Sequence, residues 1–127
     1  LSGLDKTNVT YVQNKIAFLE SETVDTIKNR IEKTLKKHSI KPNQQDAPSV
    51  LVALEEKEGD EIYFFYIKFE IGEEVKTFRD DGTQTYAITY QATDFVESGP
   101  DEIDEIVLDS IDYLLAKFEE QLEEDKE

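Results

Sequence analysis

One apolar segment in the middle of the chain, residues 61–78, limits the folds that this sequence can adopt. Aromatic and β-branched side chains fill both phases of its alternation, which is typical of a strand covered on both faces. Fully extended, the segment would reach about 59 Å at roughly 3.3 Å per residue. A domain of this chain's length is only about 36 Å across. The strand therefore has to bend or split, and Gly72, the only glycine inside it, is the expected place.

The rest of the chain shows three more strand-like segments and two helical stripes. The further strands are expected at residues 10–19, 49–56 and 83–95, with glycine-containing turns at 58–60 and 80–82. In the last of these strands the alternation is expected to place Tyr86, Ile88, Tyr90 and Ala92 on one face. The first helix begins near residue 22 and repeats its apolar residues at steps of three and four: Val24, Ile27, Ile31 and Leu35. The second helix follows Pro100 and carries Ile103, Val107, Ile111, Leu114, Phe118 and Leu122. The order β-α-β-β-β-α predicts an α+β two-layer sandwich, with a mostly antiparallel sheet of about four strands and two helices on one face.

Capping residues and charge predict where the first helix begins and ends. Ser21 or Thr23 is expected to cap the first helix, and basic residues suit its negative end. His38, the only histidine, is expected at the exposed end of this helix. The whole chain has the size of a single domain, with flexible ends expected at residues 1–8 and 123–127.

The composition excludes several kinds of site. Thirty acidic residues against fourteen basic ones give a net charge of −16, which repels phosphate and disfavours nucleic acid as a partner. The absence of cysteine excludes thiol nucleophiles and cysteine-bound metals. The acidic residues of the second helix lie on a straight helix and not in a loop, so their oxygens cannot surround a calcium ion. We therefore predict no metal site, no cofactor, no catalytic residue and no transmembrane segment, since no apolar run reaches the length of a membrane span.

The helix-free face of the predicted sheet is the best candidate for a functional surface. Phe65 and its alternate neighbours are expected to face the helices, whereas the opposite phase of the same strand is also apolar. An uncovered apolar patch of this kind is typical of an interaction surface. The alternative is that the first strand, the N-terminal arm or the curl of the sheet covers it. The residues predicted for the surface are Ile62, Phe64, Tyr66, Thr85 and Thr89.

Basic residues gather in one short segment of this acidic chain. Between residues 28 and 41, Glu32 is the only acid. A chain with such separated charge can orient a charged partner surface or a second copy of itself. The alternative is a solvated helix face whose cations suit the negative helix end. The residues of this basic segment are Lys28, Arg30, Lys33, Lys36, Lys37 and Lys41.

The order of elements resembles that of small bacterial envelope adaptor lipoproteins, including the lipopolysaccharide-assembly lipoprotein, in which two helices cover one face of a four-stranded sheet. The resemblance rests on topology without a shared residue motif, so it implies a fold and an adaptor role but no site residues. Leu1, Ser2 and Gly3 match the first three positions of a bacterial lipobox, with Leu4 where the lipid-bearing cysteine would stand. These features favour a periplasmic or secreted protein over a cytoplasmic one.

Three functions are compatible with these observations. The one that the sequence favours is a non-enzymatic protein-interaction or adaptor module, with a protein partner or a second copy on the open face. The second is a small-molecule-binding protein or enzyme whose pocket combines carboxylates with Tyr63, Tyr86 and Tyr90. The third is an acidic cytoplasmic chaperone. A closed pocket would favour the second function, and a flat exposed apolar face would favour the first.

Overall fold

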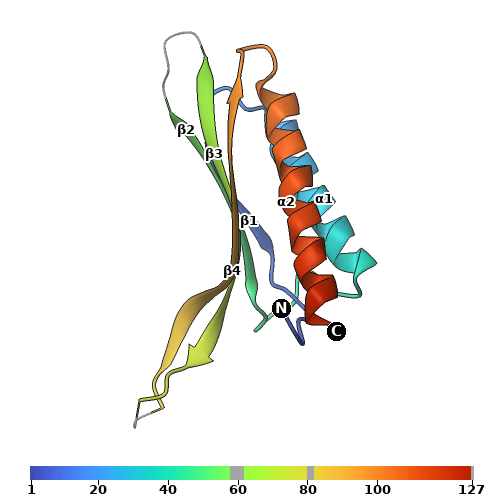
Figure 1. Cartoon of the computed structure of the whole chain (residues 1–127), viewed down its shortest axis with the longest axis vertical. Helices are drawn as coiled ribbons and strands as arrows, with labels where there is room; N and C mark the ends of the chain where they lie inside the picture. The colour runs from blue at the N-terminus through green and yellow to red at the C-terminus, as the bar shows by residue number, and fades with distance from the viewer. Residues whose placement is uncertain (58–61, 80–81, 127) are drawn as a thin grey trace.

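The structure is a computed structural model that describes residues 1–57, 62–79 and 82–126. Its elements are β1 (Thr10–Lys15), α1 (Ser21–Lys37), β2 (Ser49–Lys57), β3 (Tyr63–Lys76), β4 (Gln84–Ser98) and α2 (Ile103–Asp125). Both helices pack on the same side of the sheet (Figure 1). The predicted α+β sandwich and its β-α-β-β-β-α order are therefore confirmed. The turn predicted at 58–60 lies outside the described residues, as does most of the one at 80–82.

The four strands lie in the order β1-β2-β3-β4. β1 is parallel to β2, while β2, β3 and β4 form an antiparallel meander. A parallel pair needs a crossover connection, and α1 provides it. β1 ends at Lys15, earlier than predicted, because Ile16 and Leu19 are buried in the turn that follows the strand. Their β-branched and aliphatic side chains belong to the core without belonging to the sheet.

The long strand β3 bends at Gly72, as predicted. The register shifts at this point: Ile71 pairs with Tyr90 and Gly72 pairs with Ile88, which leaves Thr89 as an extra residue on β4. A bulge of this kind bends the strands and increases their twist. Beyond it, residues 72–76 and 84–88 continue as a two-stranded arm that leaves the two-layer body (Figure 1).

The bulge also reverses the alternation of β4. Tyr90 and Ala92 are partly buried against the core, whereas Ile88 and Tyr86 are about half exposed on the other side of the bulge. The Tyr86 ring lies where a Cβ at Gly72 would project, so any side chain at this position would displace it. The sequence pattern placed Tyr86, Ile88, Tyr90 and Ala92 on one face. That prediction is wrong, because one extra residue turns every later side chain to the opposite face.

α1 buries Ile27, Ile31 and Leu35 of the predicted stripe and partly buries Val24, but its first turn is stabilised differently from the prediction. The N-cap residue is Glu20, and neither Ser21 nor Thr23 caps the helix with its side chain. Instead the Asp104 carboxylate, on α2, accepts a hydrogen bond from the Glu20 backbone N–H (3.1 Å) and another from the Thr23 hydroxyl (2.6 Å). The predicted cap was therefore wrong, since an acid from the other helix takes that role.

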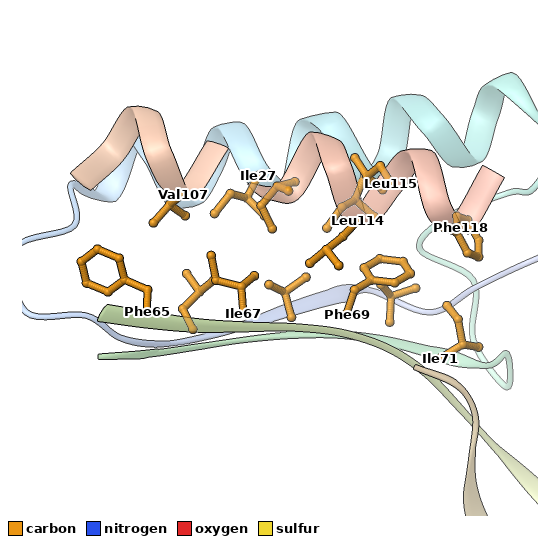
Figure 2. Close-up of a cluster of buried hydrophobic side chains, with 14 of the residues drawn as sticks. Ile27, Phe65, Ile67, Phe69, Ile71, Val107, Leu114, Leu115 and Phe118 are labelled. Carbon is orange, nitrogen blue, oxygen red and sulfur yellow. The ribbon is translucent and has the colours of Figure 1, made fainter. Parts of the chain in front are cut away.

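The core lies between the sheet and the two helices (Figure 2). The β3 side chains that point toward the helices are those predicted from the two-residue alternation: Phe65, Ile67, Phe69 and Ile71. At the lower end of α2, the Phe118 ring lies 5.2 Å from the Phe69 ring and 5.6 Å from the Tyr90 ring, measured between centroids. α2 thus packs over β3 and β4 together, and the predicted stripe from Ile103 to Leu122 is buried.

The N-terminal residues pack against the body. The Thr7 backbone N–H donates to the Lys41 carbonyl at 2.9 Å. The amino nitrogen of Leu1 lies 2.7 Å from an Asp125 oxygen at the end of α2. The flexibility expected for both ends of the chain stays a prediction. Neither described helix is long and apolar enough to cross a membrane.

Candidate functional site: the open face of the sheet

The face of the sheet that points away from the helices carries an exposed aromatic cluster. The Phe64 ring on β3 stacks on the Phe95 ring on β4, with centroids 5.8 Å apart and planes 15° from parallel. Tyr66 pairs with Phe95 in the strand register and is partly exposed. Phe95 is 58% exposed, and Ile62, just before β3, is 46% exposed. We call Ile62, Phe64, Tyr66 and Phe95 the aromatic patch.

The structure brings together only part of the predicted surface. Thr85 pairs with Val75 in the arm, far along β4 from the aromatic patch. Thr89 is the bulge residue, and its hydroxyl donates to the Ile71 carbonyl and to a Glu73 carboxylate oxygen, each at 3.4 Å. Phe95, which the sequence analysis missed, takes their place beside Tyr66. Register with Tyr66 is the signal that identifies it, and a register cannot be read from one strand alone.

A half-buried ion pair, with its carboxylate buried and its lysine partly exposed, lies at the centre of the open face. Glu70 is only 5% exposed, although it points away from the core. Its Oε1 accepts a hydrogen bond from the Gln91 side chain at 2.9 Å and lies 3.0 Å from Lys68 Nζ. The hydrogen bond and charge of Glu70 raise the pKa of Lys68 above its usual 10.5. Lys68 is therefore fully charged near neutral pH, and the pair loses its cation only as the pH rises through that raised value.

The open face is electrically balanced, unlike the chain as a whole. Strand alternation and register place three lysines and three glutamates on it: Lys15, Lys57, Lys68, Glu55, Glu70 and Glu97. The net charge of −16 therefore lies elsewhere, much of it on α2. A neutral face with an aromatic patch can approach another acidic protein without the repulsion that the rest of this surface would impose.

The basic segment is partly neutralised by α2. Arg30 pairs with Asp112 at 2.8 Å, and Lys37 pairs with Glu119 at 3.0 Å. Among the described residues, no ion pair forms at the remaining four cations: Lys28, Lys33, Lys36 and Lys41. The segment thus works in part as a contact between the two helices. The exclusion of nucleic acid by the net negative charge of the chain stays a prediction.

His38 lies in this helix contact and not at an exposed end as predicted. Its side chain is only 8% exposed, with Nε2 2.9 Å from Glu119 Oε2 and Nδ1 3.6 Å from Glu123 Oε1. The end of α1 is covered because the acidic C-terminal turns of α2 lie beside it (Figure 1). The hydrogen bonds from His38 and then Lys37 lower the pKa of Glu119 below its usual 4.5.

Glu119→Gln is expected to lower the free energy of unfolding near neutral pH and to have little effect in strong acid. A carboxyl whose pKa is lowered by folding stabilises the protein above its unfolded value, and this contribution is lost as the pH falls through the folded value. Urea denaturation over a pH series would measure the difference between the wild type and the variant. Glu124→Gln, an exposed acid on the same helix, is the control and should cost no stability. A Glu119→Gln effect independent of pH would contradict this account.

A groove of about 540 Å³ lies where the arm meets the N-terminal residues. Tyr86, Glu73 and Glu74 line it together with residues 1–6 and 46–49. The three tyrosines proposed for a pocket do not meet there. Tyr63 stacks beside Phe65 at the opposite end of β3, and Tyr90 packs in the core against Phe118. Within the described ranges, no three acidic or histidine side chains are grouped so as to hold a metal ion.

Comparison with known proteins adds no family to this description. The chain matches no model of a known protein family, and a search of curated proteins found no significant match.

Proposed function

We propose that this chain is a non-enzymatic protein-interaction module that binds a protein partner through the open face of its sheet. The observation that carries the proposal is the aromatic patch. Phe64 and Phe95 stack on each other over the strands, and no helix packs on that side of the sheet in the part of the chain that the structure describes. Burying an aromatic side chain on binding is worth roughly 1.5 to 3 kcal/mol, so this patch can supply the centre of an interface.

The surroundings of the patch support the same function. The patch is flanked by Lys57, Glu55 and Glu97, which supply a polar rim on the same face. The face has no net charge, so it suits a partner that is itself acidic or neutral. The element order, shared with the envelope adaptor lipoproteins named above, is the support for an adaptor role in a cell envelope.

Phe64→Ser combined with Phe95→Ser is expected to abolish partner capture while leaving the free energy of unfolding nearly unchanged. Affinity capture followed by mass spectrometry would compare the wild type with the double variant, and urea denaturation would measure stability. Phe78→Ser is the matched control, because Phe78 is fully exposed and lies beyond the end of β3, outside the paired strands. Proteins bound by the wild type and by Phe78→Ser, but lost from the double variant, are the expected partners. Equal capture by all three chains would refute the proposal, as would a double variant that unfolds as readily as a core variant.

A further inference from the structure

The outer edge of β4 is the longest unpaired strand edge in the described part of the chain. β4 is the last strand of the sheet and pairs only with β3. Its fifteen residues expose backbone donors and acceptors along one side. Natural proteins usually protect such an edge with lysine, proline or inward charge. β4 has no lysine or proline, and its residues 84–93 carry no charge at all, so its protection is limited to the bulge at Thr89 and to Asp94 on the helix side.

We infer that two copies of this chain pair through the β4 edges, antiparallel and about a two-fold axis, to form one continuous eight-stranded sheet. This inference uses the edge of the sheet and does not rest on the proposed function of its face. An added strand would pair with the backbone N–H and C=O groups along the outer side of β4, which have no partner strand. A second copy is the favoured strand, because the uncharged run of each β4 can face the acids at the end of the other, so that no two carboxylates lie opposite each other.

The flank of α2 that overhangs this edge is self-complementary. The Ser110 hydroxyl donates to Asp94 on β4 at 2.8 Å, which fixes the side of α2 that lies along the edge. Tyr113, one turn later, is 49% exposed and is the only large hydrophobic side chain of α2 that is exposed in the described range. Asp109 and Lys117 lie one turn before and one turn after it. A two-fold axis at Tyr113 would therefore place Lys117 of each copy opposite Asp109 of the other.

A two-fold axis at Tyr113 is also compatible with antiparallel pairing of the two β4 strands. Helix and strand run in opposite directions, and their rises of about 1.5 and 3.3 Å per residue place Tyr113 near the level of Thr93. An axis at Thr93 places Gln91 of one copy opposite Phe95 of the other, and Asp94 opposite Ala92, with no like charges facing each other. Because α2 packs over β3 and β4 together, the two α2 helices would lie about 10 Å apart, an ordinary distance for packed helices.

A shallow groove runs beside the edge where this contact would form. It is lined by residues of both elements: Asp94, Val96, Glu97, Ile106, Asp109 and Ser110. Because the groove lies between β4 and α2, the second copy could contact its apolar and polar side chains in addition to the backbone hydrogen bonds between the strands. The edge, the uncharged run and the helix flank thus point to one occupant.

Cross-linking tests the pairing, because the chain has no cysteine and any disulfide must join two copies. Thr93→Cys is expected to form a disulfide-linked dimer readily under mild oxidation, since the axis brings the two Cys side chains together. Gln13→Cys is the matched control: Gln13 lies on the same face in the opposite edge strand, β1. Equal cross-linking at the two positions, or none at Thr93→Cys, would overturn the inference.

Charge reversal tests the helix contact independently of the strands. By sedimentation equilibrium, Asp109→Lys and Lys117→Glu are each expected to weaken the dimer about tenfold, because two symmetric ion pairs become repulsions. The double variant restores both pairs and the net charge, and should restore the dimer. Asp109→Lys alone reduces the negative charge of the chain, so a stronger dimer in this variant would refute the contact. A wild-type chain that is monomeric at all concentrations would also refute it, whereas Phe64→Ser alone should leave the dimer intact, because Phe64 lies on β3 and not on the paired edge.

Discussion

Phe118→Ala is expected to lower the free energy of unfolding by about 3 to 5 kcal/mol, the usual cost of removing a buried aromatic ring. Phe118 is fully buried, and its ring contacts the rings of Phe69 and Tyr90. The loss therefore combines the transfer of the ring, the cavity left behind and two aromatic contacts. These contacts join α2 to two neighbouring strands, so the cavity cannot close without moving a helix or a strand. Urea denaturation with a fixed slope would measure the change.

The control for this substitution lies on the same helix. Tyr113→Ala removes an aromatic ring of similar size from an exposed position and should change the unfolding free energy of the monomer by less than about 0.5 kcal/mol. Phe65→Ala, at the other end of β3, should resemble Phe118→Ala, since Phe65 is also fully buried. A Phe118→Ala cost no larger than that of Tyr113→Ala would mean that α2 does not pack on the sheet as described.

Lys68→Met is expected to cost about 1.5 to 3 kcal/mol, although Lys68 lies on the open face and not in the core. The reason is Glu70, which is 5% exposed and would lose its cation while keeping the hydrogen bond from the Gln91 side chain. Leaving a buried carboxylate without its counter-charge destabilises the fold by more than the intact ion pair stabilises it. Chemical denaturation at neutral pH would measure this cost.

The double variant Lys68→Met with Glu70→Leu separates the two effects. Removing both charges also removes the stranded carboxylate, so stability should return to near the wild-type value or above it. The same double variant joins the apolar side chains of β2, Leu51 and Ala53, to the aromatic patch across the face. It should therefore bind a hydrophobic dye more strongly than the wild type. A double variant as unstable as Lys68→Met alone would show that the pair stabilises the sheet outright.

Local sequence patterns predicted the elements and their order because each element has its own periodicity. The α2 stripe from Ile103 to Leu122 and the alternation of Phe65, Ile67 and Phe69 are both properties of short segments. The bend at Gly72 could be predicted from length and from the one glycine available. None of these conclusions requires knowledge of what lies across the sheet.

The features that could not be predicted all depend on contacts between distant residues. Asp104 caps the start of α1 from 84 positions away, and Glu119 reaches His38 from 81 positions away. Phe95 joins the aromatic patch only because of its register with β3. The Thr89 bulge leaves no mark in the β4 sequence, since the residues on either side continue to alternate plausibly. The candidate surface was therefore predicted on β3 and missed on β4.

The bulge divides the β3–β4 hairpin into two parts that tolerate different substitutions. Within the body, every second residue of β4 has to suit the space beneath α2, as Tyr90 and Ala92 do. Beyond Thr89 the alternation restarts in the opposite phase, where neither helix lies above or below the strands. Substitutions in the arm at Thr85 or Ile88 are thus free of the packing constraints that restrict the body, whereas the Tyr86 ring packs on Gly72. The arm can change its chemistry over evolutionary time at little cost to the fold that holds it, while Gly72 stays tied to the aromatic ring that covers it.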